Sequence, residues 1–216
     1  MAGVAAPADR RPGLRPRAAR AILIGSAAGL AAIAIAASGI LRSGSDQLHG
    51  VPADGRPAAP DFVLGDQHGE PFRLRDARGN VVLLVFGYTN CPDACPLTLA
   101  TWARARAALA DDARRVRFVF VSVDPVRDSS QQIGRFVAQF DPGFVGVTGP
   151  SADLEDVVVG YGAYAQVAEA GHHGDPVIAH SEATFLIDRD GRIVEALPSG
   201  TTAADITADI RLVLGR

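Results

Sequence analysis

The continuous apolar run Val81–Phe86 and the mostly apolar stretch Val116–Val123 are the strongest patterns along the chain. Such segments are typical of central strands that are buried on both faces. Between them, residues 95–110 carry Trp102 and Leu109 on one helical stripe, which predicts an amphipathic helix. We therefore expect a strand–helix–strand unit at the centre of the fold.

Shorter patterns surround this unit. Ser129 followed by Gln132 predicts a capping box at the start of a helix, and Ser151 is expected to cap the next helix. The remaining expected elements are a hairpin of Phe62–Leu64 and Phe72–Leu74, a strand at Phe144–Val147, a hairpin of Thr184–Ile187 and Arg192–Ala196, and a last helix with Ile206, Ile210, Val213 and Leu214 on one face. This order predicts an α/β three-layer sandwich on a mixed sheet, over residues 59–216.

Residues 21–41 carry no charged side chain and are expected to form an N-terminal transmembrane helix. At ~1.5 Å per residue such a helix would span roughly 31 Å, which is the thickness of a bilayer core. The segment before it, 1–20, holds five arginines against one acid, so we expect it to be cytoplasmic. Residues 42–58 have no apolar period and are interpreted as a linker.

Two other interpretations of the N-terminal segment remain open. Ala34-Ile35-Ala36 resembles the cleavage site of a signal peptide, although the apolar run exceeds the usual length of a signal core. Arg10-Arg11 partly resembles a twin-arginine signal. We favour an uncleaved single-pass anchor in the inner membrane, and all three interpretations place the remaining chain on the extracytoplasmic, periplasmic side.

The charge balance argues against a nucleic-acid partner, because the net charge is −3. All basic residues are arginine, which also excludes lysine chemistry. The chain contains two cysteines, Cys91 and Cys95, located between the first central strand and its helix. A dithiol in this position makes the predicted fold thioredoxin-like.

A structural disulfide is the simplest interpretation of two cysteines outside the cytoplasm. However, a bridge that closes so short a loop stabilises little, and a domain of this length can bury roughly 70% of its unfolded surface without one. The start of a helix favours a thiolate, and residues four apart lie on one helical face. Cys91 and Cys95 could therefore form a redox-active pair or hold one soft metal ion, for which a third ligand is needed.

Few residues can supply that third ligand. The single methionine is Met1, so we exclude a thioether. Among the five histidines, His49 and His68 are expected to be solvated, and His172 and His173 lie in a polar loop with at most an auxiliary metal contact. His180 leads into the strand Thr184–Ile187, which would run beside the dithiol. From the residues alone, a ligand and an ordinary loop histidine are equally supported.

Three ordered motifs resemble those of the SCO/SenC family. The first is Phe86–Pro96, which reads FGYTNCPDACP. The second is Val121–Pro125 with Arg127 and Asp128, and the third is His180-Ser181 ahead of Phe185–Asp188 with Gly191. One departure is Asn90, where the family motif often has a histidine that is not one of its three ligands.

The resemblance implies a membrane-anchored, thioredoxin-like copper chaperone that helps to assemble the CuA centre of cytochrome c oxidase. It implies copper as cofactor, with Cys91, Cys95 and His180 as ligands. Asp124 would lie near the site, either supporting it or contacting a partner, although an Asp that simply ends a strand in a turn explains the motif as well. The implied partners are subunit II of the oxidase and, beyond it, other copper chaperones and a thioredoxin-like reductant.

A second function class is a periplasmic thiol–disulfide oxidoreductase without a copper role, and a third is a peroxiredoxin-like peroxidase. Against the oxidoreductase are the extra residue between the cysteines and the lack of a proline immediately before Thr184. Against the peroxidase, that chemistry needs no histidine at position 180. We therefore expect a metallochaperone, with enzymatic activity at most as an accessory disulfide reductase.

Overall fold

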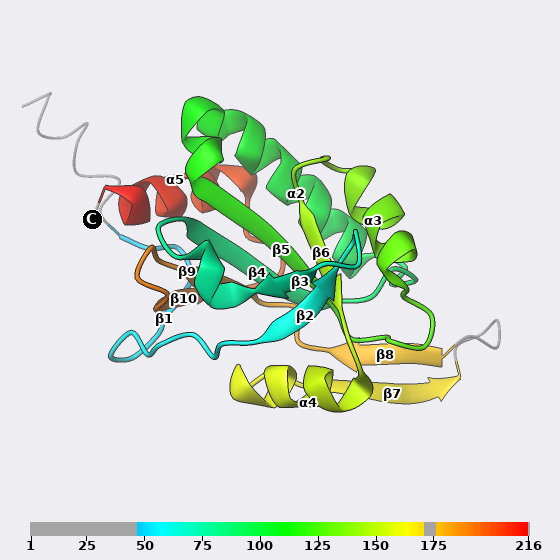
Figure 1. Ribbon diagram of the computed structural model, residues 1–216. Helices are drawn as coiled ribbons and strands as arrows, with labels where there is room; N and C mark the ends of the chain where they lie inside the picture. The colour runs from blue at the N-terminus through cyan, green and yellow to red at the C-terminus, as the bar shows by residue number, and fades with distance from the viewer. Residues whose placement is uncertain (1–46, 171–175, 216) are drawn as a thin grey trace, which may run out of the picture. The chain divides into compact units, whose positions relative to one another are not determined.

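The central sheet of the computed structural model is mixed and twisted (Figure 1). The structure describes residues 47–170 and 176–215, and within them the sheet has the order β1-β10-β9-β4-β5-β6-β2-β3. Strands β4 (Val81–Gly87) and β5 (Val116–Ser122) are parallel and pair along their whole length. Every residue of β4 is buried, so the prediction of two central strands is confirmed.

The other strands flank this pair. β6 runs parallel to β5, and the remaining pairings are antiparallel. Their bounds are β1 (Val51–Pro52), β2 (Val63–Asp66), β3 (Pro71–Arg73), β6 (Val145–Thr148), β9 (Thr184–Ile187) and β10 (Ile193–Leu197). Both predicted hairpins are therefore present, as β2–β3 and β9–β10.

Helices cover both faces of the sheet, as Figure 1 shows. On one face lie α2 (Ala94–Leu109), α3 (Ser130–Ala138) and α5 (Ala203–Leu214), whose apolar side chains share one core cluster. On the other face α4 (Ser151–Gly160) packs into a second cluster. Two 3₁₀ turns, η1 (Leu74–Ala77) and η2 (Ala110–Arg115), follow β3 and α2. The predicted three-layer arrangement is confirmed.

The helix starts differ in part from the prediction. The Ser129 hydroxyl accepts the N–H of Gln132 at 3.2 Å as expected, but the Gln132 side-chain carbonyl accepts from Arg135. The predicted cap at Ser151 is wrong. Ser151 is the first helical residue, because the Pro150 carbonyl already accepts the N–H of Leu154 at 3.1 Å.

A separate two-stranded sheet, β7 (Ala165–Ala170) with β8 (Pro176–His180), was not predicted. Its strands pair with Ala165 opposite His180. His180 therefore ends a strand of its own rather than lying in a lead-in to β9. His172 and His173 lie outside the described residues.

The His49 side chain is exposed, as predicted, but the residue also binds a buried carboxyl group. Its backbone N–H donates to Asp209 Oδ2 at 3.2 Å, and its Nδ1 lies 2.7 Å from Asp209 Oδ1. The next N–H, of Gly50, donates to Glu195 Oε2 at 2.7 Å. Both carboxyl groups are buried, with Asp209 1% and Glu195 0% exposed. We call His49, Glu195 and Asp209 the carboxyl cluster.

The segment that follows His49 is part of the sheet, because Val51 and Pro52 of β1 pair with Ala196 and Glu195 of β10. This part of the predicted linker 42–58 is thus integral to the folded domain. Within the described ranges, no helix is both long and apolar enough to cross a bilayer. The predicted anchor at 21–41 and the N-terminal segment 1–20 lie outside those ranges.

Candidate metal centre

The loop between β4 and α2 places both cysteines at the end of a buried strand. Cys91 lies in the loop, where its N–H donates to the Tyr88 carbonyl at 3.2 Å. Cys95 lies in the first turn of α2, which begins after Asp93 as N-cap. Gly87 makes room for this turn, because a Cβ there would lie only 2.6 Å from Cys95 Sγ.

The two thiols are free and unequal. Both side chains are buried, and the N–H of Cys95 points at Cys91 Sγ over 3.5 Å. The Cys95 thiol hydrogen bond is the main cause that lowers the pKa of Cys91 to about 4, with further help from His180 and the helix-start N–H groups. The same hydrogen bond and burial raise the pKa of Cys95. At neutral pH the pair is therefore one thiolate and one thiol that share a proton.

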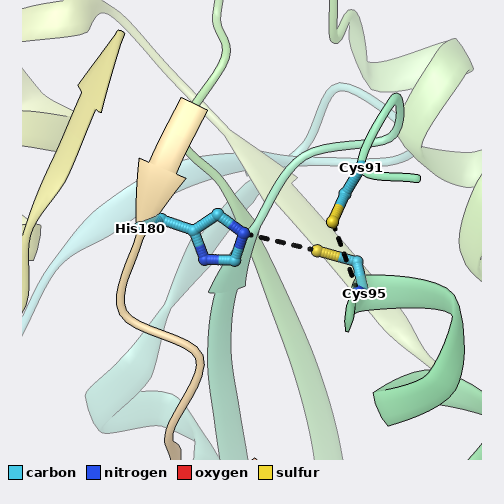
Figure 2. A group of neighbouring side chains, drawn as sticks. All are labelled: Cys91, Cys95 and His180. Atoms are coloured by element: carbon cyan, nitrogen blue, oxygen red, sulfur yellow. Dashed lines mark hydrogen bonds between the residues drawn. The ribbon is translucent and has the colours of Figure 1, made fainter. Parts of the chain in front are cut away.

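His180 completes the group from the end of β8 (Figure 2). Its Nε2 lies 3.7 Å from Cys95 Sγ, while Nδ1 lies 3.1 Å from the Ser181 carbonyl. A carbonyl accepts only, so Nδ1 carries a proton and Nε2 is directed at the sulfurs. The ligand atoms of the three residues all lie within 4.8 Å of one another.

The His180 imidazole and the Cys91 thiolate also affect each other's protonation. Burial by itself would lower the pKa of His180. The hydrogen bonds to the Cys91 thiolate and to the Ser181 carbonyl, together with the nearby negative charge of Cys91, outweigh burial and raise that pKa. Without a metal ion, protons are therefore bound to the donor atoms that would otherwise bind the cation. A metal ion would replace the Cys95 proton.

The donor set fits a soft metal ion. Two sulfurs and one imidazole nitrogen are the ligands that Cu(I), and to a lesser degree zinc, prefer, and structural zinc sites usually have four protein ligands. Exposed fractions of 8% for Cys91, 4% for Cys95 and 7% for His180 show that little water reaches the donors. Among the described residues, no other group of three His, Cys, Asp or Glu donors converges in this way.

Asp124 is 5% exposed but is bonded to Arg127 instead of to a ligand. Its side chain also accepts the N–H of Arg127 at 3.3 Å, and its carbonyl accepts the N–H of Asp128 at 2.9 Å. The turn interpretation of the second motif is therefore confirmed. A role near the metal would have to pass through Arg127.

Sequence reasoning missed Asp128 as a supporting residue of the site. Its buried carboxylate accepts the Thr89 N–H at 2.9 Å, the Thr89 hydroxyl at 2.6 Å and the Ser122 hydroxyl at 2.6 Å. These bonds join the cysteine loop to the end of β5. The only sequence signal was the place of Asp128 in the second motif, which gives no hint of its partners.

A reduced dithiol at a helix start, with a histidine against it on a mixed α/β sheet, defines a thioredoxin-like protein with a metal or redox centre. The chain belongs to the SCO1/SenC family, whose model matches residues 51–215. That match includes all three predicted ligands.

Individual relatives agree with this assignment. The SCO2-like protein RP587 of Rickettsia prowazekii is 33% identical over 146 residues, which are 67% of this chain and 71% of the relative. The structure of Bradyrhizobium japonicum ScoI with copper bound is 33% identical, with a TM-score of 0.67 over 72% of this chain and 99% of ScoI. BsSco, a member of the Sco family of cytochrome c oxidase assembly proteins, is 23% identical with a TM-score of 0.60 over 76% of this chain and 97% of BsSco, and supports the fold alone.

Proposed function

We propose that this protein is a membrane-anchored copper chaperone that delivers copper to the CuA site in subunit II of cytochrome c oxidase. Copper is its cargo, held by Cys91, Cys95 and His180. The observation that carries the proposal is the convergence of two sulfurs and Nε2 within 4.8 Å in a buried site. The copper-bound state of ScoI, a relative at 33% identity, supports the choice of metal.

Three ligands suit delivery better than storage. A site with three protein ligands leaves a coordination position at which an acceptor thiolate can bind before the donor ligands leave. The low pKa of Cys91, about 4, means that this ligand is already ionised at neutral pH. Copper release and rebinding then require protonation changes mainly at Cys95.

The proposal includes the location and the partners expected from the sequence. The uncharged segment 21–41 would anchor the chain in the inner membrane, and the domain would face the periplasm. Other copper chaperones would supply the metal, and a thioredoxin-like reductant would keep the two cysteines reduced.

A second function, disulfide reduction, is favoured by the same Cys91 thiolate. Cys91 would attack a partner's disulfide and form a mixed disulfide, which Cys95 would then resolve. The partner gains two electrons and leaves as a dithiol, and this chain is left with a Cys91–Cys95 disulfide. Such a step could prepare the acceptor cysteines before copper transfer.

Anaerobic Cu(I) titration of the reduced full chain against a competing chelator tests the copper role. We expect one copper per chain, and for Cys91→Ser or Cys95→Ser a loss of affinity larger than the roughly 10- to 100-fold cost of removing a supporting contact. His180→Ala should mainly weaken Cu(II), because two thiolates satisfy Cu(I). Equal Cu(I) affinity in the wild type and in Cys91→Ser would contradict the proposal.

Mixing the copper-loaded chain with the reduced CuA domain of subunit II separates the two functions. Copper transfer to the domain supports the chaperone role. If the chain reduces an oxidised CuA domain but binds no copper, disulfide reduction is the function that remains.

A further inference from the structure

His180 lies on an element that is separate from the one that carries the cysteines. β8 pairs with β7 in the two-stranded sheet, and the described strands of the main sheet do not pair with either. The register of the main sheet therefore reaches the imidazole only through the three residues that join His180 to β9, which pairs with β4. A contact closer to the imidazole can help to set the distance between Nε2 and the sulfurs.

Tyr88 contacts both the loop that carries the cysteines and the strand β8 that carries His180. It follows β4 directly, is 2% exposed, and its carbonyl accepts the N–H of Cys91 at 3.2 Å. Its hydroxyl accepts the N–H of Ile178, in β8, at 3.4 Å. Its ring lies edge-on to the His180 imidazole, with 5.7 Å between centroids and an interplanar angle of 90°.

We propose that Tyr88 is a positioning residue that holds the His180 imidazole at its distance from the Cys91–Cys95 pair. This inference rests on the proposed copper-binding function. Tyr88 touches no metal and acts only through His180. The bond from Ile178 to the Tyr88 hydroxyl is long for a hydrogen bond, so the ring contact carries more of the effect than the hydroxyl.

Arg127 and Asp124 extend the same support. The guanidinium carbon of Arg127 lies 5.7 Å from the centroid of the Tyr88 ring, which is within the range of a cation–π contact. Arg127 in turn forms an ion pair with Asp124, whose N–H donates to the Ser122 hydroxyl at the end of β5 at 3.1 Å. Asp124 therefore acts on the site through Arg127 and Tyr88.

Two substitutions of Tyr88 separate the effect of the ring on copper binding from the effect of the hydroxyl. In Tyr88→Leu, we expect Cu(II) affinity to fall by roughly 10- to 100-fold, the range for contacts that orient a ligand. The Cu(II)–thiolate absorption and the nitrogen hyperfine signal of the imidazole should weaken together. Tyr88→Phe keeps the ring and should show a smaller loss of the same kind, while Cu(I) affinity should stay close to the wild type in both variants.

Tyr161→Phe is the matched control. Tyr161 is also buried, at 7% exposed, and its hydroxyl makes a bond of the same 3.4 Å length, to the Pro60 carbonyl. It belongs to the core cluster on the α4 face, so its Cu(II) spectrum should not change. A wild-type Cu(II) spectrum and affinity in Tyr88→Leu would overturn the inference. An equal loss of Cu(I) and Cu(II) affinity would overturn it too, because that pattern indicates general loosening.

Hydrogen exchange in the metal-free chain tests the inference without copper. The Ile178 amide should exchange faster in Tyr88→Phe than in the wild type, and should be unchanged in Tyr161→Phe. If the wild type binds no copper, the proposed function fails, but this exchange result still tests the Tyr88 contact. If copper binds and the Ile178 exchange rate does not change, the contact fails while the function stands.

A double-mutant cycle tests the place of Asp124. Asp124→Asn alone should lower Cu(II) affinity by less than Tyr88→Leu does. In the Tyr88→Leu background it should have no further effect, because residues that act through one contact are not additive. Additive losses would show that Asp124 acts on the site by another route.

Discussion

The metal centre and the carboxyl cluster each place buried acidic side chains beside one histidine, which is buried in the metal centre and exposed in the carboxyl cluster. In the metal centre, the sulfurs of Cys91 and Cys95 and the Nε2 of His180 face one another. In the carboxyl cluster, His49 Nδ1 lies 2.7 Å from Asp209 and Nε2 lies 3.5 Å from Asp205, so each nitrogen already faces a carboxylate.

The comparison shows that titratable side chains beside a histidine can serve either to stabilise the fold or to bind a metal ion. In the carboxyl cluster, the backbone N–H groups of His49 and Gly50 donate to Asp209 and Glu195, and these bonds help to hold β1 against β10. The donor atoms of the metal centre instead hydrogen-bond mainly to one another, through protons that a soft cation can replace. The first region stabilises the fold, whereas under the proposed function the second exchanges copper with a partner.

The largest expected contrast is in thiol reactivity. Because the pKa of Cys91 is lowered to about 4 and that of Cys95 is raised, iodoacetamide should modify Cys91 alone in the reduced, metal-free chain. Its rate should be flat from pH 6 to 8, where the thiolate fraction of an ordinary thiol rises by roughly two orders of magnitude. Peptide mapping by mass spectrometry measures this. Modification of both cysteines, or a rate that climbs with pH, would contradict the assignment.

One added methyl group in each region should sharpen the comparison. A Cβ at Gly87 would lie 2.6 Å from Cys95 Sγ, and a Cβ at Gly50 would lie 2.6 Å from Glu195 Oε2. We expect Gly87→Ala and Gly50→Ala each to lower the free energy of unfolding by about 1–3 kcal/mol, the usual cost of overpacking. Only Gly87→Ala should also lower Cu(I) affinity.

Gly65→Ala is the control for both, because a Cβ there meets the Thr148 carbonyl at an ordinary 3.5 Å. Urea unfolding and Cu(I) titration of the three variants decide the matter. If Gly50→Ala weakens copper binding as much as Gly87→Ala does, the two regions are not independent.

The most gradual expected effect is the pH dependence of stability. Burial, together with the nearby Asp209 carboxylate, raises the pKa of Glu195 to about 7 from an ordinary 4.5. Between these values the folded state binds more protons than the unfolded state, so stability falls as pH rises, by at most about 1.4 kcal/mol per pH unit for one group. The hydrogen bond to Asp209 raises the pKa of His49, which adds a loss in the same direction above pH 6.5.

Glu195→Gln should flatten this dependence, since an amide cannot ionise. The variant should match the wild type near pH 5 and exceed it in stability near pH 8, as measured by urea unfolding. Glu155→Gln, at an exposed position of α4, is the control and should keep the wild-type slope. A wild-type slope in Glu195→Gln would mean that Glu195 does not titrate in this range.

The sequence predicted the elements that carry strong apolar patterns. No long-range information is needed to predict β4, β5 and the helical stripe through Trp102 and Leu109. The local spacing of apolar residues is enough to predict which face of a strand or helix is buried. The cysteines were found for the same reason, since their position relative to β4 and α2 is local.

Contacts across the sequence could not be predicted in this way. The β7–β8 pair lacks an apolar pattern, and Val167 in it is 71% exposed. The contact between Tyr88 and Ile178 joins residues 90 positions apart. Asp209 did leave a signal, because it lies three positions after Ile206 and next to Ile210, on a face that should be apolar. An acid at such a position indicates a polar partner, which is His49.

The two edges of the main sheet have a consequence for solubility. β1 and β3 are the outer strands; they are only two and three residues long, and each contains a proline, Pro52 or Pro71. Short edges with proline offer few free N–H groups to a strand from another molecule. The docking of β1 on β10 therefore also protects the domain from edge-to-edge aggregation, so a chain that lost this strand would be expected to aggregate at lower concentration.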